Sequence, residues 1–236
     1  MLFIKTKPFK MKNLLLAVFF LSTTFLVAQN PINKNVGDFN EVKVFDLIKV
    51  SLVKSDENKV MITGENADDV EIIIKNNLLK VRMKLDRSFD GTKTFVAVHY
   101  SDIKLIDANE GAKVVGNELI TQDSIELRAQ EGASIIVGLD VDRVTVRAVS
   151  GGIIETRGKA NTQDITLNTG GIYEGRDFET KNTTVKVRAA GEAEVKASNS
   201  VDARITAGGT IDIYGNPKNV TKKQTFGGKI RVKDTE

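Results

Sequence analysis

Residues 127–173 read LRAQEGASIIVGLDVDRVTVRAVSGGIIETRGKANTQDITLNTGGIY, and this stretch repeats itself about every twenty residues. Each repeat is centred on a glycine turn, and the same pattern extends on both sides of the stretch. The turn glycines are Gly111, Gly132, Gly151, Gly170, Gly191, Gly208 and Gly227, spaced by 21, 19, 19, 21, 17 and 19 residues. A sustained period of this length is typical of solenoids, in which each repeat packs only against its neighbours.

Apolar side chains recur at fixed odd offsets from each glycine, which is the alternation that strands flanking a turn require. Three residues after the glycine stand Val114, Ile135, Ile154, Tyr173, Ile211 and Ile230, and three residues before it stand Ala108, Ala129, Ala148, Leu167 and Ile205. The fifth repeat fits this register only after a shift of one residue, which places Glu192 at the glycine position and turns Ala189, Val187 and Val195 inward. One inward face therefore runs through all seven repeats.

The length of the repeat distinguishes between the possible β architectures. A coil of about 19 residues at ~3.3 Å per residue has a perimeter of roughly 63 Å, enough for two or three strands and their corners. Glycine suits such corners because it accepts a positive φ without steric cost. A propeller blade needs about twice this period, and a sandwich would not preserve one inward register. We predict an all-β fold, a right-handed parallel β-helix with coils of about 20 residues.

The chain before the repeats is also β-rich. Residues 29–104 contain short alternating strands, such as 48–54 and 78–84, separated by turn residues. We expect this segment to be continuous with the solenoid or to cap it. Residues 105–236 then hold the glycine-turn repeats and, after Pro217, a C-terminal cap.

Residues 1–28 have the organisation of a secretory signal peptide, with lysines before an apolar run (14–27) that ends at Ala28. Met11 opens a more typical signal than Met1, so either residue is a candidate start. We expect an exported protein, located in the periplasm, at the outer-membrane surface or outside the cell. The chain has no cysteine, which excludes disulfides and thiolate chemistry.

The overall charge gives no case for nucleic-acid binding. The chain has 34 basic and 31 acidic residues, but Lys5, Lys7, Lys10 and Lys12 lie in the leader, and without them 30 basic residues face 31 acidic ones. A nearly neutral chain lacks the electrostatic footprint of a nucleic-acid binder.

Parallel β-helices can carry polysaccharide lyases and hydrolases, which need clustered carboxylates or a calcium site with a basic residue. The candidate acidic pairs are Asp68 with Asp69, Asp140 with Asp142, and Asp86 with Asp90. Asp68 and Asp69 are interpreted as solvated turn residues, and the other pairs lack the spacing of a calcium loop. An enzyme would have to bring carboxylates and a basic residue together in one groove of the folded chain.

The only histidine, His99, lies on a predicted strand, FVAVHY (95–100). A histidine metal site or a catalytic triad would have to be built around this single imidazole. We therefore assign His99 a structural or surface role, and the sequence predicts no metal and no cofactor. The glycine turns lack the lysine and the strand-to-helix context of a phosphate-binding loop.

The outward positions of the repeats carry a row of arginines. Four residues before the turn glycine stand Arg128, Arg147 and Arg204, with Arg188 at this position in the shifted fifth repeat. Stacked in register, they would form a ladder suited to the carboxylates or sulfates of an acidic polysaccharide. The alternative is an ordinary solvated face on which Glu126, Asp164 and Asp202 neutralise the arginines. Tyr214 and Phe178 are candidate sugar-stacking residues beside the ladder.

With the repeats laid out, the chain resembles the GIN domain, the head domain of putative auto-transporter adhesins in exported Bacteroidetes proteins. The resemblance rests on the signal peptide, the segment VGDFNEVKVFDLIKVSLVKSDENKVMITGE (36–65), the GA and GG turns, and IDIYGNPKNV (211–220) followed by FGGKI (226–230). It covers residues 36–230 and implies a right-handed β-helix with an adhesin-like role. It carries over no functional residue, since the matching Tyr214, Gly215 and Pro217 are interpreted as structural.

Three functions follow from these observations. The first is a non-enzymatic envelope or surface module that binds an acidic polysaccharide or a cell-surface protein. The second is a polysaccharide lyase or hydrolase. The third is a purely structural envelope protein without a specific ligand.

Overall fold

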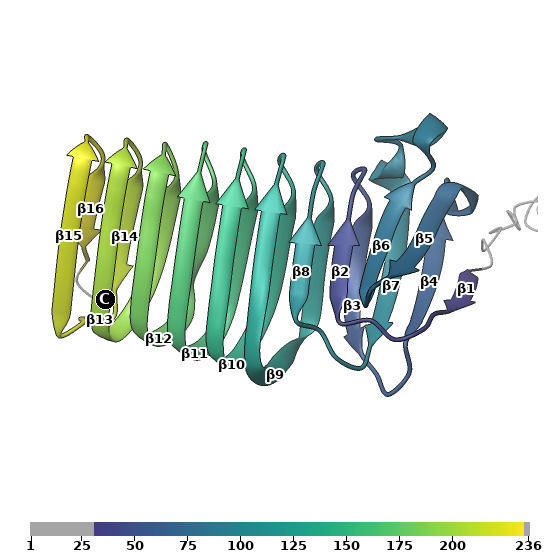
Figure 1. Cartoon of the computed structure of the whole chain (residues 1–236), viewed down its shortest axis with the longest axis horizontal. Helices are drawn as coiled ribbons and strands as arrows, with labels where there is room; N and C mark the ends of the chain where they lie inside the picture. Colours follow the sequence, from purple (N-terminus) through teal and green to yellow (C-terminus); the bar gives the residue numbers. More distant parts are fainter. Residues whose placement is uncertain (1–30, 234–236) are drawn as a thin grey trace, which may run out of the picture. The chain divides into compact units, whose positions relative to one another are not determined.

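The computed structural model describes residues 31–233, so the expected signal peptide and both candidate start residues lie outside the described part of the chain. The described residues form a right-handed β-solenoid whose coils stack along one axis (Figure 1). The predicted all-β, parallel β-helix fold is confirmed. Within residues 31–233, no helix is long and apolar enough to cross a membrane.

The N-terminal elements are short. They are β1 (Ile32–Asn35), β2 (Glu41–Val44), β3 (Lys49–Lys54), β4 (Lys59–Gly64), η1 (Ala67–Asp69), β5 (Val70–Lys75), β6 (Leu78–Met83), η2 (Leu85–Arg87), η3 (Gly91–Lys93), β7 (Thr94–Tyr100) and β8 (Leu105–Ala108). The C-terminal strands are longer, and most run through a whole coil. They are β9 (Lys113–Gln130), β10 (Ser134–Val149), β11 (Ile153–Asn168), β12 (Ile172–Ala189), β13 (Glu192–Ala207), β14 (Thr210–Tyr214), β15 (Asn219–Phe226) and β16 (Lys229–Val232).

Each coil has two faces joined by a tight turn. The entry face consists of the strand segments that lead into the turns, including β2, β8 and β15, and it faces the viewer in Figure 1. The exit face consists of the segments that leave the turns, including β3, β14 and β16. Neighbouring coils pair in parallel from β9 to β13, and then β14 and β15 both pair with β13 on opposite faces. Parallel stacking pairs the backbone of each coil with the coils on either side.

The turns explain the glycine period. In the turn 109–112, Glu110 and Gly111 have φ of 53° and 69°, and the Ala112 amide donates to the Asn109 carbonyl oxygen (3.0 Å). These are the features of a type I′ turn, which favours glycine because both central residues have positive φ. The turns around Gly132, Gly151 and Gly170 are built in the same way.

The second glycine of the GG turns has a different role. A Cβ at Gly152 would lie 2.2 Å from the Ala129 carbonyl oxygen, and one at Gly171 would lie 2.1 Å from that of Ala148. In both cases the added Cβ would meet the backbone of the preceding coil, so the close approach of the two coils requires glycine at these positions.

The N-terminal segment is both continuous with the solenoid and its cap. Strands β2 and β3 form a coil that lies between the coil of β6 and β7 and the coil of β8 and β9. On the outer side, β4 pairs antiparallel with β7, β5 pairs antiparallel with β6, and β1 covers β4. Antiparallel strands therefore close this end, while the chain crosses over β2 and β3 to start β8.

The fifth coil shifts in the direction opposite to the one expected. Thr166 pairs with Lys186, and Lys186 pairs with Arg204, so Lys186 occupies the outward position that the sequence assigned to Arg188. The left-handed turn residue is Ala190 (φ 48°), and the Gly191 carbonyl oxygen accepts from the Thr210 amide as the Gly171 carbonyl oxygen accepts from the Glu192 amide. The extra residue lies at the far corner, where the pairing of β11 and β12 jumps between Glu155 and Gly158. A corner insertion leaves the register around the turn unchanged, which sequence spacing alone did not reveal.

Candidate functional site

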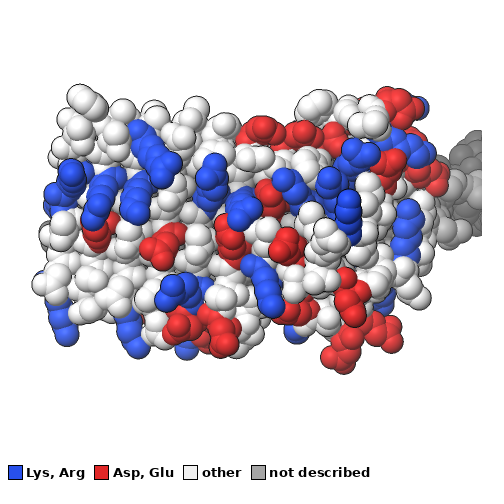
Figure 2. Space-filling view, in the orientation of Figure 1, with Lys and Arg blue, Asp and Glu red and all other residues white. Residues whose placement is uncertain are grey.

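The cationic row is the first candidate binding surface. We define it as Arg128, Arg147, Lys186, Arg204 and Lys223, which occupy one aligned outward position on the entry face. The row continues through Thr166, the one uncharged position between Arg147 and Lys186. Figure 2 shows Lys and Arg side chains crossing this face along the long axis, with acidic side chains beside them.

Only part of this row is neutralised. Arg128 Nε lies 2.6 Å from Glu126 Oε1, and Arg204 forms two hydrogen bonds with Asp202, at 3.0 and 2.6 Å. The hydrogen bond from Arg204 lowers the pKa of Asp202. The solvated-face interpretation is therefore correct for these two arginines.

The centre of the row is different. Among the described residues, Arg147 and Lys186 form no ion pair, and both side chains are exposed. Asp164, which the sequence placed as a neutralising carboxylate, also has no ion-pair partner in the described part of the chain. Arg147 and Lys186 thus lie between two neutralised arginines, and Lys223, which also forms no ion pair among the described residues, lies beyond Arg204. These three cations remain available to a ligand.

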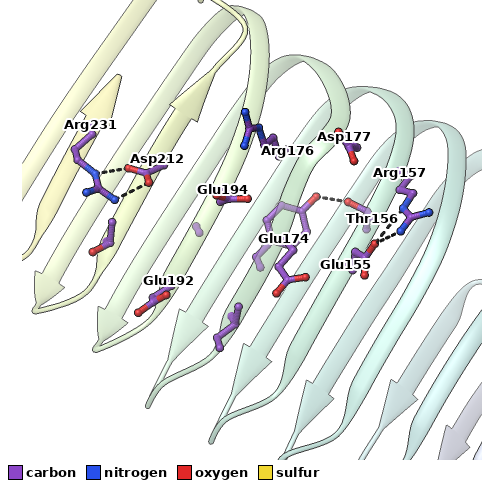
Figure 3. Close-up of a pocket in the computed structure, with 14 residues that line it drawn as sticks. Glu155, Thr156, Arg157, Glu174, Arg176, Asp177, Glu192, Glu194, Asp212 and Arg231 are labelled. Atoms are coloured by element: carbon purple, nitrogen blue, oxygen red, sulfur yellow. Dashed lines mark hydrogen bonds and ion pairs between the residues drawn. The ribbon is translucent and has the colours of Figure 1, made fainter. Parts of the chain in front are cut away.

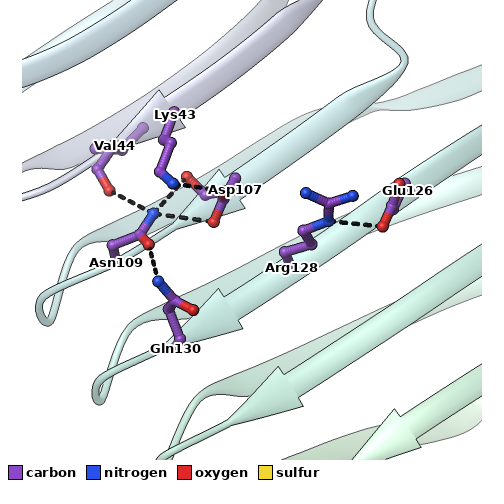
Figure 4. Close-up of polar contacts among 7 residues, drawn as sticks. All are labelled: Lys43, Val44, Asp107, Asn109, Glu126, Arg128 and Gln130. Carbon is purple, nitrogen blue, oxygen red and sulfur yellow. Dashed lines mark hydrogen bonds and ion pairs between the residues drawn. The ribbon is translucent and has the colours of Figure 1, made fainter.

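The N-terminal end of the row is fixed by a polar cluster (Figure 4). Asp107, buried next to Arg128 in the same row, forms an ion pair with Lys43 (3.1 Å). Asn109 Nδ2 donates to Asp107 Oδ1 (2.9 Å), and Gln130 donates to the Asn109 side-chain oxygen. This cluster joins β2, β8 and β9, so it secures the cap to the repeats and does not offer free groups to a ligand.

The acidic groove is the second candidate surface, and it lies on the exit face (Figure 3). We define it by Glu155, Glu174, Glu194 and Asp212, which are aligned on four successive coils. These residues line a hollow of about 510 Å³ together with Glu192, Arg157, Arg176 and Arg231. Like charges at directly opposed positions repel one another, so this row lowers the stability of the fold unless positive charge lies nearby.

Within the described residues, arginines form ion pairs with this row only at the two ends of the groove, and Arg176 also lines it but lies over the Tyr214 ring. Arg157 Nη2 lies 2.6 Å from Glu155, and Arg231 binds both carboxylate oxygens of Asp212 at 2.5 and 2.6 Å. In the described residues, Glu174 has no ion-pair or hydrogen-bond partner. Glu194 only accepts a hydrogen bond from the Tyr214 hydroxyl (3.3 Å). The groove therefore has neutralised ends, and the carboxylates at its centre have no ion-pair partner among the described residues.

The aromatic candidates do not flank the arginine ladder. Phe178 is fully buried in the core, so its assignment as a sugar-stacking residue is wrong. Tyr214 belongs to the exit face, where the Arg176 guanidinium lies over its ring at 4.9 Å. Arg188 lies two residues beyond Lys186 on β12, outside the aligned row.

The acidic pairs named from the sequence are dispersed. Asp69 forms ion pairs with both Lys84 and Arg87. Asp90 forms one with Arg87, and Asp140 forms one with Lys159. Asp142 accepts a hydrogen bond from Asn161 (2.5 Å). Within residues 31–233, no group of three or more His, Asp or Glu side chains is arranged to hold a metal ion.

His99 lies on β7 between Val53 and Lys59, and its pKa is lowered by partial burial and by Lys59. No catalytic partner of the described chain hydrogen-bonds its ring. It therefore has the environment of a structural surface histidine.

Sequence reasoning missed the acidic groove, although a signal was present. Glu155, Glu174 and Asp212 each stand four residues after a turn glycine, at an outward position next to the inward one. Only three repeats show this directly, because Glu194 aligns with them once the fifth coil is set on Ala190. The groove also brings carboxylates and arginines together, which is the convergence that the enzyme hypothesis requires.

Comparisons with known proteins place this capped solenoid in a described family. The profile of the family described as "putative auto-transporter adhesin, head GIN domain" matches residues 38–217. The chain belongs to this family. A search of functionally curated proteins finds no match.

Several solved structures share the fold. A putative adhesin from Bacteroides fragilis superposes with a TM-score of 0.79 at 16% identity, over 86% of this chain and 96% of that chain. A putative adhesin from Parabacteroides distasonis gives 0.71 at 21% identity, with the same coverage. A putative lipid binding protein from the same species gives 0.63 at 15% identity, over 89% and 98% of the two chains. At these identities the likeness extends to the fold and not to a ligand.

Proposed function

We propose that this chain is a non-enzymatic, exported adhesin-like module of the cell envelope that binds an acidic polysaccharide along the cationic row. The observation that carries the proposal is the row itself, in which cations are aligned on successive coils and Arg147 and Lys186 lack carboxylate partners. Membership of the adhesin head family supports a binding role at a surface.

The row fits an extended polyanion better than a small ligand. Its positions repeat with the coils at ~4.8 Å, so the row presents positive charge along an extended line and not at a single point. Arginine offers two parallel donors to a carboxylate or sulfate, and each charge-assisted bond contributes about 1.5–3 kcal/mol. Exposure of the row lets a polymer run past both neutralised ends.

The test is a binding measurement on a glycan array, followed by titration of the best acidic polysaccharide. We expect Arg147→Ala with Lys186→Ala to weaken binding at least about tenfold, and Arg128→Ala to weaken it less because Glu126 already holds Arg128. Arg87→Ala with Lys93→Ala, in the N-terminal loop, is the matched control for the loss of one arginine and one lysine. Equal binding by the two double variants would refute the proposal, and the absence of any glycan ligand would favour a purely structural role.

A polysaccharide lyase or hydrolase is a second candidate, because Glu174 and Glu194 lie in the acidic groove beside arginines. Paired carboxylates perform acid and base catalysis in such enzymes. Incubation with acidic and neutral polysaccharides should then release shortened products, and Glu174→Gln should abolish this release while the fold is kept. Intact polysaccharides after long incubation would remove this candidate.

A further inference from the structure

The two charged surfaces are built from the same coils. In each of four coils, the entry-face position and the groove position are eight residues apart, across the turn. The pairs are Arg147 with Glu155, Thr166 with Glu174, Lys186 with Glu194, and Arg204 with Asp212. One molecule therefore carries a row of cations on one face and a row of acids on the opposite face, at the same positions along its axis.

The two rows also have the same repeat distance. Each row has one position per coil, and neighbouring positions of a row lie about 4.8 Å apart, because both rows follow the stacking of one solenoid. If two copies lie side by side with parallel axes, Arg147, Lys186 and Arg204 of one copy can face Glu155, Glu194 and Asp212 of the other without loss of register. The groove is hollow, whereas lysine and arginine side chains extend from the opposite face, so the shapes are compatible as well.

The charges that lack partners are at the centre of both surfaces. Arg147 and Lys186 have no carboxylate partner within residues 31–233, and neither Glu174 nor Glu194 has a cationic one there. In the register above, Lys186 of one copy faces Glu194 of the other, and Arg147 and Lys186 lie one coil to either side of Glu174. A second copy would therefore relieve the repulsion between Glu174 and Glu194, which are paired directly across neighbouring strands.

We propose that this protein associates side by side with a second copy of itself, the cationic row of one copy lying in the acidic groove of the next. The interface joins two different surfaces, so it does not close into a dimer and can extend into a row of solenoids. The proposal goes beyond polysaccharide binding, and an acidic polymer on the cationic row would compete with it.

The contact is expected to be weak. The contact would extend over four coils at ~4.8 Å along the axis and about seven strand residues at ~3.3 Å across it. Its area is therefore roughly 450 Å² per copy, or about 900 Å² in total. Stable interfaces bury about 1,200–2,000 Å², so the association belongs to the weak class and depends on high local concentration. Electrostatic attraction between exposed groups is also screened by salt.

The test is sedimentation of the purified protein over a range of concentrations, at about 20 mM and at about 500 mM salt. We expect the average mass to increase with concentration at low salt and to stay that of a monomer at high salt. Reversing the groove (Glu174→Lys with Glu194→Lys) or the row (Arg147→Glu with Lys186→Glu) should abolish association in each case. The matched control for the groove reversal is Asp56→Lys with Glu57→Lys, two exposed residues away from both surfaces.

The decisive measurement is the sedimentation of a mixture of the two reversed variants. The reversed row is complementary to the reversed groove, and the two native surfaces are still complementary, so the mixture should associate although neither variant does alone. Circular dichroism would verify that each variant is folded. A wild-type protein that stays monomeric at low salt, or a mixture that stays monomeric, would overturn the proposal. The groove-reversed variant keeps its cationic row, so its polysaccharide binding tests the proposed function separately.

Discussion

The hydroxyl of Tyr173 lies 2.5 Å from the hydroxyl oxygen of Thr156, inside the solenoid and shielded from solvent. Gln163 donates a further hydrogen bond to the same phenol oxygen, and Thr183 donates to Gln163 Oε1 (3.3 Å). Gly175 makes room for the ring, because a Cβ there would lie 2.3 Å from Tyr173 Cε1. Burial raises the pKa of the phenol well above its ordinary value, so Tyr173 stays protonated and can hold these partners.

Tyr173→Phe is expected to destabilise the protein by about 1–3 kcal/mol, because Thr156 and Gln163 would lose a buried partner. The free energy of unfolding from chemical denaturation measures this change. Tyr214→Phe is the matched control, since its hydroxyl makes one long bond at the surface and its loss should cost less than about 0.5 kcal/mol. Equal stability of the two variants would show that the interior polar network does not contribute.

The glycines of the turns should differ in their tolerance of alanine. Gly152→Ala and Gly171→Ala place a Cβ within about 2 Å of a carbonyl oxygen, so the coils would have to separate, and we expect a loss of about 2–4 kcal/mol. At Gly132 the φ of 72° is unfavourable, but nothing lies within 4 Å of an added Cβ, so Gly132→Ala should cost about 1–2 kcal/mol. Thermal and urea unfolding would give the order, and a larger loss at Gly132 would contradict the close-packing argument.

The recurrence of inward residues such as Ile135 and Ile154 at one offset from successive glycines was sufficient to predict the parallel coils, because a fixed period places equivalent residues of neighbouring coils side by side. The position of the coil made by β2 and β3 was not predictable, since the pairing of Val44 with Ala108 and Val81 depends on a crossover between distant segments. The extra corner residue that brings Lys186 into the row was not predictable either. The spacing of the glycines gives the length of a coil, but it does not show which corner holds an extra residue.

Binding residues were predicted less well than the fold, for a physical reason. Whether a surface charge is available depends on its neighbours across strands, and these follow from register. The carboxylate two positions before Arg128 is visible in the sequence, whereas the place of Lys186 in the row follows only from the strand pairing. The acidic groove became visible only when Glu194 was aligned with Glu174 by the strand pairing.

The stability of the cap junction should depend on pH through Glu110. Its pKa is raised by burial and by the negative charges of Asp46 and Glu131. The folded state therefore binds a proton more tightly than the unfolded state, so this group lowers stability as pH rises from the ordinary carboxyl pKa through the raised value. At pH values above the raised pKa, the loss of folding free energy caused by this group no longer increases.

Glu110→Gln should accordingly stabilise the protein at pH 7 and flatten the pH dependence of unfolding in that range. Unfolding free energies of the wild type and the variant between pH 4 and 7 measure the effect. Glu57→Gln, at an exposed position, is the control and should leave the curve unchanged. A destabilised Glu110→Gln variant at pH 7 would mean that the carboxylate is favourable in the folded state.

The C-terminal edge of the solenoid is protected by polar residues at positions that face inward in other coils. On β15, Lys222 pairs with the buried Ala203 and Gln224 pairs with the buried Ile205, so both would be apolar in an internal coil. Charged and polar residues on an open edge disfavour pairing with another chain. Replacing them with valine, as Lys222→Val with Gln224→Val, should therefore promote end-to-end association that persists at high salt, detectable by light scattering. Lys218→Val with Lys229→Val removes two lysines and no inward polar residue, and is the comparison. If the first variant stays monomeric at high concentration, the inward positions of β15 are not what keeps this end of the solenoid free.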